Sequence, residues 1–147
     1  MRLFIITVLG SLTLLACSKK KTEMVWDVNF PRLGSESSLR AEDLNGDGIK
    51  DLILGAGENE YVETPQGILA IDGKNGSLLW QQEAKDLVFG SATFIDVTKD
   101  GISDIFIGGR QCIFKGIDGK TGSQLWAYDP AKYQEDSILG KAHLNFL

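Results

Sequence analysis

Two short acidic segments carry the side chains in this sequence that are best suited to bind a cation. In residues 43–51, Asp and Asn occupy alternating or nearly alternating positions: Asp43, Asn45, Asp47 and Asp51. A looser copy follows later in the chain, with Asp96, Thr98, Asp100 and Asp104. Ca²⁺ prefers about six to eight hard oxygen ligands, which carboxylates at alternate positions of a sharply turning loop can supply. The repetition predicts a structural unit that occurs twice and is built around a calcium loop.

Other types of calcium loop fit these segments poorly. Gly48 and Gly101 permit the sharp chain reversal that any such loop needs. An EF-hand also requires a carboxylate at its twelfth position, where Leu54 and Ile107 stand, and dockerin-type loops fail for the same reason. In the second segment, the neutral hydroxyl of Thr98 replaces a carboxylate or amide, so the second cation site is predicted to be the weaker one.

The segments around the loops have the composition of short β-strands. Runs rich in Leu, Ile and Ala are separated by Asn-Gly, Asp-Gly and Gly, which favours strands joined by tight turns. The predicted strands are 38–43, 51–55, 67–72 and 77–82, and then 91–96, 104–108, 112–118 and 123–128. Each acidic loop then connects the first two strands of its set. The Asp-Gly pairs at 72–73 and 118–119 lack further carboxylates, so we interpret them as hairpin turns without a metal.

A second repeated pattern supports the same unit. Residues 70–80 and 116–126 share the order Ile-Asp-Gly-Lys-x-Gly-Ser-x-Leu-Trp. Trp80 and Trp126 end this pattern, and we interpret them as side chains that pack between neighbouring units rather than as ligand-stacking groups. The first copy has a longer acidic loop, residues 58–66, between its second and third strands. Insertions of this kind often lie on a binding face.

The pattern of four strands per unit predicts the fold class and the organisation of the chain. It is typical of β-propeller blades, so we expect an all-β protein with two four-stranded antiparallel propeller-type blades and the start of a third. The predicted segments are a signal peptide at 1–16, a lipidated cysteine and tether at 17–36 with one further strand at 25–28, blade one at 37–84, blade two at 85–129 and a truncated third blade at 130–147.

Two known kinds of propeller repeat resemble these residues. Phe89-Gly90, the Asp96–Asp104 loop and Gly108-Gly109, together with the loop at 43–51, resemble the FG-GAP repeat of integrin α-chains and bacterial surface proteins. The 70–80 and 116–126 segments resemble the tryptophan-docking motif of quinoprotein propellers. The first copy departs from the FG-GAP pattern, because Glu36-Ser37 stands where Phe-Gly is usual.

The FG-GAP resemblance implies a set of calcium ligands for each loop. In the first loop, Ile49 would ligate through its carbonyl and the side-chain ligands would be Asp43, Asn45, Asp47 and Asp51. In the second loop, Ile102 would ligate through its carbonyl and the side-chain ligands would be Asp96, Thr98, Asp100 and Asp104.

The N-terminus resembles the export signal of bacterial lipoproteins. Arg2 is followed by an uncharged, mostly apolar run from Leu3 to Leu15, which is shorter than the roughly 20 residues of a membrane-spanning helix. Ala16 before Cys17 resembles a lipobox, which implies cleavage before Cys17 and attachment of acyl chains such as palmitate. We therefore expect a lipid-anchored protein of the bacterial cell envelope, and Ser18 resembles a signal for the outer membrane rather than the inner one.

Composition narrows the range of functions. The net charge of −5 at pH 7 argues against a nucleic-acid partner. Only Cys112 remains after Cys17 is lipidated, so no internal disulfide is expected, and Cys112 is interpreted as a buried strand residue. We expect a non-catalytic scaffold that binds a protein or glycan. The alternatives are a fragment of a quinoprotein dehydrogenase or polysaccharide lyase, and a subunit that assembles several copies into one ring.

Overall fold

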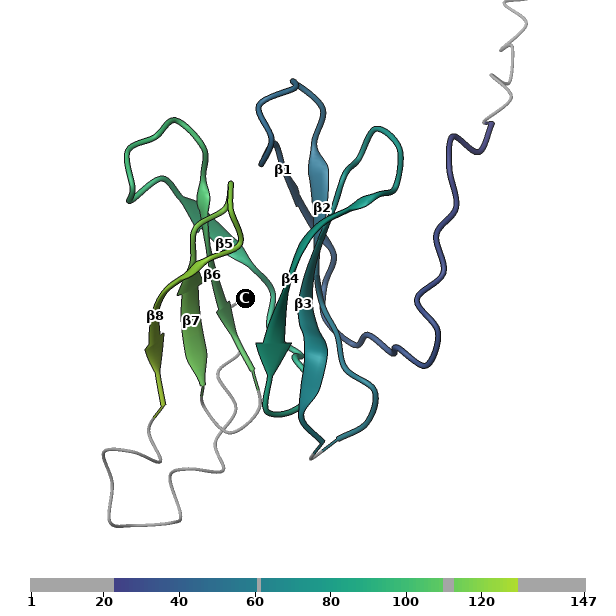
Figure 1. Ribbon diagram of the computed structural model, residues 1–147, viewed down its shortest axis with the longest axis vertical. Coiled ribbons are helices and arrows are strands. Elements are labelled where there is room, and N and C mark those ends of the chain that lie inside the picture. The colour runs from purple at the N-terminus through teal and green to yellow at the C-terminus, as the bar shows by residue number, and fades with distance from the viewer. Residues whose placement is uncertain (1–22, 61, 110–112, 130–147) are drawn as a thin grey trace, which may run out of the picture.

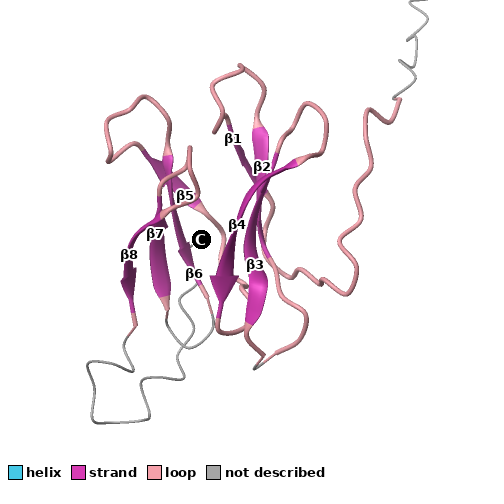
Figure 2. Cartoon of the chain, in the orientation of Figure 1, coloured by secondary structure: helices cyan, strands magenta, loops and turns pink. Residues whose placement is uncertain are grey.

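The described part of the chain is built of strands and loops. The computed structural model describes residues 23–60, 62–109 and 113–129. These residues form eight β-strands in two four-stranded antiparallel sheets, and they contain no helix (Figures 1 and 2). The expected all-β class, with two antiparallel sheets of four strands, is confirmed.

Each sheet is a simple meander in which sequential strands are neighbours. The first sheet contains β1 (Arg40–Glu42), β2 (Asp51–Gly55), β3 (Thr64–Ile71) and β4 (Leu78–Ala84). The second sheet contains β5 (Thr93–Ile95), β6 (Asp104–Gly108), β7 (Phe114–Ile117) and β8 (Gln124–Tyr128). The order β1-β2-β3-β4 in one sheet and β5-β6-β7-β8 in the other repeats the same topology. Short turns suffice for such sheets because all neighbouring strands are antiparallel.

Most predicted strands lie where the sequence placed them, and the differences have local causes. β2 and β6 have the predicted bounds, whereas β3 begins at Thr64 rather than at residue 67 because the pairing Thr64–Ala84 extends the ladder beyond a register shift. The prediction of a strand at 25–28 is wrong. Those residues pair with no strand, and the side chain of Val25 is 83% exposed.

One continuous apolar cluster joins the two sheets, which lie side by side (Figure 1). The members from the first sheet and its acidic loop are Leu44, Ile53, Ile68, Ala70 and Trp80. The members from the second sheet and the segment before it are Val88, Ala92, Ile105, Ile107 and Ile117. Each fully buried aliphatic side chain of this kind contributes about 1.5–3 kcal/mol to stability, so the two sheets form one cooperative core.

Trp80 of the first sheet makes a specific contact with a turn of the second sheet. Its indole Nε1 donates a hydrogen bond to the carbonyl of Gly119, at 2.8 Å, in the turn between β7 and β8. A Cβ atom on Gly122 would lie 2.5 Å from the indole Cγ, so only glycine lets the ring approach this turn closely. The predicted packing of Trp80 between the units is confirmed.

Trp126 differs from Trp80 in its surroundings. Its side chain is 41% exposed, and its ring packs against Phe106 and Phe114 of the same sheet, with ring centroids 5.8 and 5.3 Å away. The prediction that Trp126 packs between two units is therefore not met within the described residues, where its ring contacts lie inside one sheet.

The opposite face of the first sheet is covered by the segment that precedes it. Trp26, Phe30 and Leu33 pack on a second apolar cluster, whose buried members are Ala56, Leu69 and Ile71. The indole Nε1 of Trp26 donates to the carbonyl of Gly73 at 2.8 Å. This segment thus covers a sheet face without adding a strand to the sheet.

Several sequence-based predictions concern residues outside the described ranges. They are the signal peptide, the lipidation of Cys17, the strand position of Cys112 and the third blade at 130–147. Within the described residues, no helix has the length and apolar character to span a membrane.

Candidate functional site

The two acidic loops occupy equivalent places at the same end of the two sheets. One loop connects β1 with β2 and the other connects β5 with β6, as the sequence predicted (Figure 1). Both are flanked by strands, which agrees with the exclusion of an EF-hand.

In the first loop, the candidate ligands accept hydrogen bonds from the loop backbone. Asp43 accepts from the N–H groups of Gly46 and Gly48 through its two oxygens, at 2.8 and 2.9 Å. Asn45 accepts from the N–H of Asp47, and Asp47 from the N–H of Ile49, both at 2.9 Å. These local hydrogen bonds between side chains and the backbone stabilise the chain reversal.

The second loop repeats this arrangement with one strained residue. Asp96 accepts from the N–H groups of Lys99 and Gly101 at 2.6 and 3.1 Å, and Asp100 accepts from the N–H of Ile102 at 2.9 Å. Lys99 adopts φ of 62°, in the left-handed region, at the place where the first loop has Gly46 with φ of 78°. A side chain in this region costs roughly 1–2 kcal/mol, a cost that the glycine of the first loop avoids.

Asp51 and Asp104 have a different role from the other candidate ligands. They are 0% and 1% exposed. Asp51 accepts from the N–H of Leu44 in its own loop at 2.9 Å and from the N–H of Gly73 in the β3–β4 turn at 3.0 Å. The carboxylate therefore joins the acidic loop to the neighbouring hairpin turn.

Asp104 makes the same connection in the second sheet. It accepts from the N–H groups of Val97 and Thr98 at 2.8 and 2.9 Å and from the N–H of Gly119 at 3.3 Å. A Cβ atom on Gly119 would lie 1.9 Å from the carbonyl oxygen of Ser103, so this position requires glycine.

These hydrogen bonds lower the pKa of two of the carboxyls. Desolvation alone would raise the pKa of Asp104, but the N–H groups of Thr98, Val97 and Gly119 stabilise its ionised form and hold its pKa below the ordinary Asp value. Desolvation would likewise raise the pKa of Asp43, and the N–H groups of Gly48 and Gly46 reverse that effect and lower it. Both groups are therefore ionised at neutral pH.

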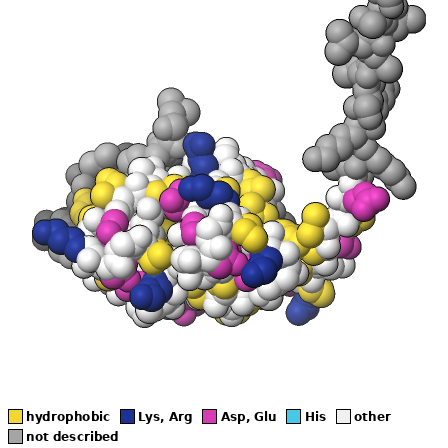
Figure 3. Space-filling view, turned by 90° about the horizontal axis from the view of Figure 1, so that it is seen from above, with side chains coloured by type: hydrophobic (Ala, Val, Ile, Leu, Met, Phe, Trp, Pro, Cys, Tyr) yellow, Lys and Arg dark blue, Asp and Glu magenta, His cyan; other side chains and the backbone are white. Residues whose placement is uncertain are grey.

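A lysine lies beside the second carboxylate of each loop. Lys74 Nζ lies 3.6 Å from an Asp47 oxygen, and Lys120 Nζ lies 3.8 Å from an Asp100 oxygen. Seen from above, acidic and basic side chains are interspersed on one face (Figure 3). The repulsion among the loop carboxylates is thus reduced by ammonium groups and by backbone N–H donors.

Carboxylate and amide oxygens are suitable ligands for Ca²⁺, but in this structure they are not arranged around a common point. No three Asp, Glu, His or Cys side chains among the described residues are grouped so as to hold a metal ion. Asp51 and Asp104 face the hairpin turns, and the side chain of Ile102 packs against the core. Each carboxylate oxygen has two acceptor sites, so the backbone bonds leave acceptor capacity in the exposed loop residues.

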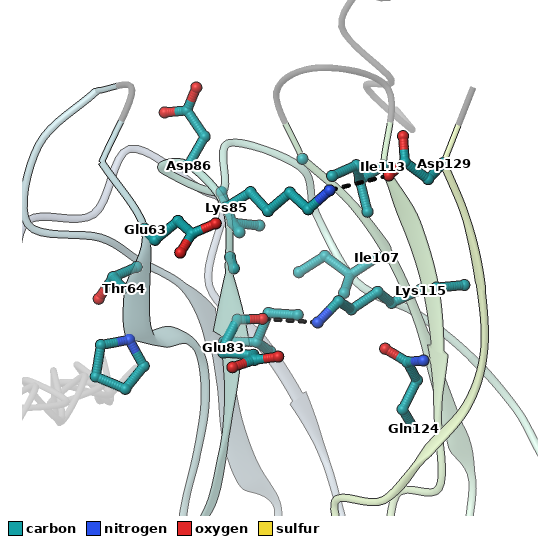
Figure 4. A pocket seen from close by; sticks show the side chains of 16 residues that line it. Glu63, Thr64, Glu83, Lys85, Asp86, Ile107, Ile113, Lys115, Gln124 and Asp129 are labelled. Carbon is teal, nitrogen blue, oxygen red and sulfur yellow. Dashed lines mark hydrogen bonds and ion pairs between the residues drawn. The ribbon is translucent and has the colours of Figure 1, made fainter. Parts of the chain in front are cut away.

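A cleft at the other end of the sheets is a second candidate site, with a volume of about 450 Å³ (Figure 4). Its walls come from the start of β3, the end of β4, and strands β6 to β8. The lining residues are Glu63, Thr64, Pro65, Ile68, Glu83, Ala84, Lys85, Asp86, Val88, Ile107, Gly109, Ile113, Lys115, Gln124, Ala127 and Asp129. Apolar side chains and several polar groups are thus combined in one hollow.

Two lysines cross this cleft from one sheet toward the other. Lys115 Nζ donates to the carbonyl of Glu83 at 2.7 Å, and Lys85 Nζ lies 3.1 Å from an Asp129 oxygen (Figure 4). Burial lowers the pKa of Lys115, the charge of Glu83 opposes that effect, and the charge of Lys85 adds to it. The cleft therefore offers ammonium donors in a partly desolvated environment.

Sequence reasoning did not identify this cleft. Its lining comes from five strands and the segment at 85–88, so no local spacing of residues marks it. The one signal was the longer loop at 58–66 in the first copy, which contributes Glu63, Thr64 and Pro65 to the wall.

The chain was compared with known proteins in three ways. No family model, curated protein or solved structure matches it.

The hydrogen bonds to Asp104 predict how stability depends on pH. Asp104→Asn removes a charged acceptor from three N–H groups and is expected to lower the free energy of unfolding at pH 7 by about 1.5–3 kcal/mol. Because the pKa of Asp104 is lowered by folding, its contribution is present above the unfolded value of about 3.9 and disappears as pH falls through the lower folded value. Urea unfolding between pH 7 and pH 2.5 measures the difference in the free energy of unfolding between the wild type and Asp104→Asn.

The control for this prediction is Asp27→Asn, because Asp27 is exposed. It is expected to change the free energy of unfolding by less than about 0.5 kcal/mol across the range. A difference between wild type and Asp104→Asn that stays constant down to pH 2.5 would contradict the proposed role of the ionised carboxylate.

Proposed function

We propose that this chain is a non-catalytic binding scaffold made of β-propeller-type blades, which binds a protein or glycan. The observation that best supports this proposal is the repetition of one set of structural contacts in both sheets. In each sheet, a buried carboxylate accepts a hydrogen bond from the N–H of a glycine in the hairpin turn, Gly73 or Gly119. The carbonyl of that glycine accepts a hydrogen bond from an indole, which belongs to Trp26 for Gly73 and to Trp80 for Gly119. Stacked repeats of this kind supply a rigid frame on which loops form binding surfaces.

We place the ligand in the cleft between the sheets. Its lining combines apolar side chains such as Ile107 and Val88 with hydrogen-bonding groups from Lys115 and Gln124. A few placed polar groups within an apolar hollow are characteristic of binding sites. Because Lys115 already donates to a backbone carbonyl across the cleft, a peptide carbonyl or a sugar hydroxyl could take the place of that acceptor.

Ligand binding is tested with a phage-displayed peptide library and an oligosaccharide array, each applied to the full chain. Lys115→Met removes the ammonium donor and is expected to weaken binding of the selected ligands at least about tenfold, equivalent to about 1.4 kcal/mol. Isothermal titration measures the affinities.

The matched control is Lys120→Met, because Lys120 lies at the opposite end of the second sheet beside Asp100. Affinity is expected to stay within about twofold in this variant. Ligands whose affinity is unaffected by Lys115→Met would show that the binding site is not the cleft.

We also propose that Ca²⁺ stabilises the acidic loops, more strongly the first than the second. The first loop offers the side-chain oxygens of Asp43, Asn45 and Asp47 on its exposed side, and its backbone turns there at glycines with positive φ. In the second loop, Thr98 contributes a neutral hydroxyl and Lys99 is strained. An ion would also compete with the ammonium of Lys74 for Asp47.

The calcium proposal predicts a change in thermal stability. Ca²⁺ titration of the full chain is expected to raise its melting temperature, since a ligand that binds only the folded state stabilises it. Asp47→Ala is expected to reduce that rise, and Lys74→Met is expected to enlarge it because the competing ammonium is removed. Thermal melts with Ca²⁺ and with a chelator provide the measurement, and Mg²⁺ at equal ionic strength is the control. An unchanged response in Asp47→Ala would rule out this residue as a ligand.

We further propose that the chain is anchored to the membrane of a bacterial cell envelope by lipid on Cys17, with the outer membrane as its location. The support is the apolar run that ends in Ala16-Cys17 and the following Ser18. Two or more acyl chains on one residue anchor a protein stably, whereas a single chain does so only marginally.

Lipidation is tested by expressing the full chain in a bacterium with labelled palmitate. The wild-type chain is expected to carry the label and to fractionate with outer membranes, whereas Cys17→Ser is expected to lose both properties because the thioether cannot form. Gel fluorography and intact mass measure the modification, and Cys112→Ser is the matched control. Labelling that survives Cys17→Ser would contradict the assignment.

A further inference from the structure

The cleft between the sheets contains an ammonium group whose donors the described residues use only in part. A lysine ammonium carries three N–H donors. Among the described residues, Lys115 makes one hydrogen bond with Nζ, to the neutral carbonyl of Glu83 at 2.7 Å. The other lysine of the cleft, Lys85, has a carboxylate partner instead, because its Nζ lies 3.1 Å from an Asp129 oxygen. Lys115 therefore retains donors for a ligand that enters the cleft.

A second donor lies on the same wall of the cleft. Gln124 on β8 pairs with Ile117, which lies two residues along β7 from Lys115. Because side chains of a strand alternate between its two faces, Gln124 and Lys115 lie on the same face of the sheet, and both line the cleft (Figure 4). Gln124 is exposed, so its amide N–H groups are accessible. An ammonium and an amide on one wall are suitable donors for the two oxygens of a carboxylate.

The floor of the cleft is aliphatic. Ile68, Val88 and Ile107 belong to the lining and are 2%, 4% and 2% exposed. No aromatic side chain occurs among the lining residues within the described ranges, so a sugar ring has no aromatic face to stack on there. An aliphatic side chain of a ligand would gain stability from the apolar area that it buries on this floor. The lining thus favours an amino-acid side chain over a sugar.

The wall formed by the first sheet is acidic. Glu63 and Glu83 are exposed and line the cleft on that side (Figure 4). Asp86 accepts from the N–H of Leu87 at 2.7 Å, and its carboxylate points away from the ammonium groups of the two lysines. Because Glu63 and Glu83 would repel a ligand that carries only negative charge, a ligand that also carries a positive group is more complementary to the cleft.

We propose that the cleft binds the free carboxyl end of a polypeptide whose last residue is aliphatic and whose preceding residue is basic. The proposal rests on the proposed function, because it takes the cleft as the ligand site. The terminal carboxylate accepts from Lys115 and Gln124, the last side chain packs on the aliphatic floor, and the basic side chain lies beside Glu63 and Glu83. A volume of about 450 Å³ admits the end of a chain rather than a folded surface.

The test uses two synthetic peptides that differ only at the carboxyl end. One is acetyl-Gly-Ala-Lys-Leu with a free carboxylate, and the other has the same sequence with a carboxamide. The carboxylate peptide is expected to bind the full chain at least about tenfold more tightly, because hydrogen bonds to a charged acceptor are stronger than those to a neutral one. Isothermal titration in nonionic detergent measures both affinities.

Variants of Lys115 assign this preference to the cleft. Lys115→Met is expected to reduce the preference for the carboxylate peptide to within about twofold, because the ammonium is lost. Lys115→Arg keeps the positive charge and is expected to retain most of the preference. Lys120→Met is the matched control, because Lys120 lies beside Asp100 at the opposite end of the sheet, and it is expected to retain the full preference. A lysine with only a structural role would not distinguish the two peptides.

A second measurement needs no variant of the protein, so it remains available if Lys115→Met fails to fold. Replacement of the last leucine of the peptide by glycine is expected to weaken binding to the wild-type chain at least about fivefold, because less apolar area is buried. Replacement of the peptide lysine by glutamate is expected to weaken binding as well, because of repulsion by Glu63 and Glu83.

Three results would overturn the proposal: equal affinity of the two peptides for the wild-type chain, absence of binding by both, or a preference for the carboxylate that persists in Lys115→Met. If ligands selected from the peptide library or the oligosaccharide array still depend on Lys115, the cleft remains the binding site and only the carboxyl-end assignment is wrong. If no selected ligand depends on Lys115, the cleft is not the binding site and both proposals are wrong.

Discussion

The structure depends on one repeated interaction, a buried carboxylate that holds a hairpin turn. Asp51 accepts from the N–H of Gly73, and Asp104 accepts from the N–H of Gly119. The carbonyl of each glycine also accepts a hydrogen bond from an indole: Gly73 from Trp26, and Gly119 of the second sheet from Trp80 of the first sheet. The carboxylate therefore fixes the turn, the turn receives the tryptophan, and the tryptophan joins one sheet to the next. Loss of a charged acceptor at the first step would leave buried N–H groups without a partner, which is costly in a dry core.

Two kinds of interaction offset the negative charge of the acidic loops. Backbone N–H groups stabilise the ionised carboxylates, and Lys74 and Lys120 lie within 4 Å of one carboxylate in each loop. These exposed pairs are worth at most about 1 kcal/mol each, so they moderate the repulsion without closing the loop around a fixed partner. A divalent ion would act more strongly because it draws several oxygens to one point. The same loop sequence is thus compatible with a structural turn and with a cation site.

The strands and loops were predictable because their signals are local. Apolar runs and Asp-Gly turns predicted the bounds of β2 and β6 correctly. The repeat predicted correctly that both acidic loops connect equivalent strands. The segment at 25–28 has strand composition, but it packs through Trp26 and pairs with no strand. Local propensity could not reveal this, because a strand also needs a neighbouring edge with free hydrogen-bonding groups.

The sequence by itself determined the repeat, the all-β class and the residues at which each chain reversal occurs, since turn chemistry and strand alternation act over a few residues. Only the tertiary structure separated the roles of the acidic residues. Asp51 and Asp104 look like their neighbours in the sequence, but the fold buries them against glycines from a distant turn. Tertiary structure likewise buried Trp80 and left Trp126 exposed, and it formed the cleft from both sheets. Burial depends on which surfaces meet, and that information is spread over the whole chain.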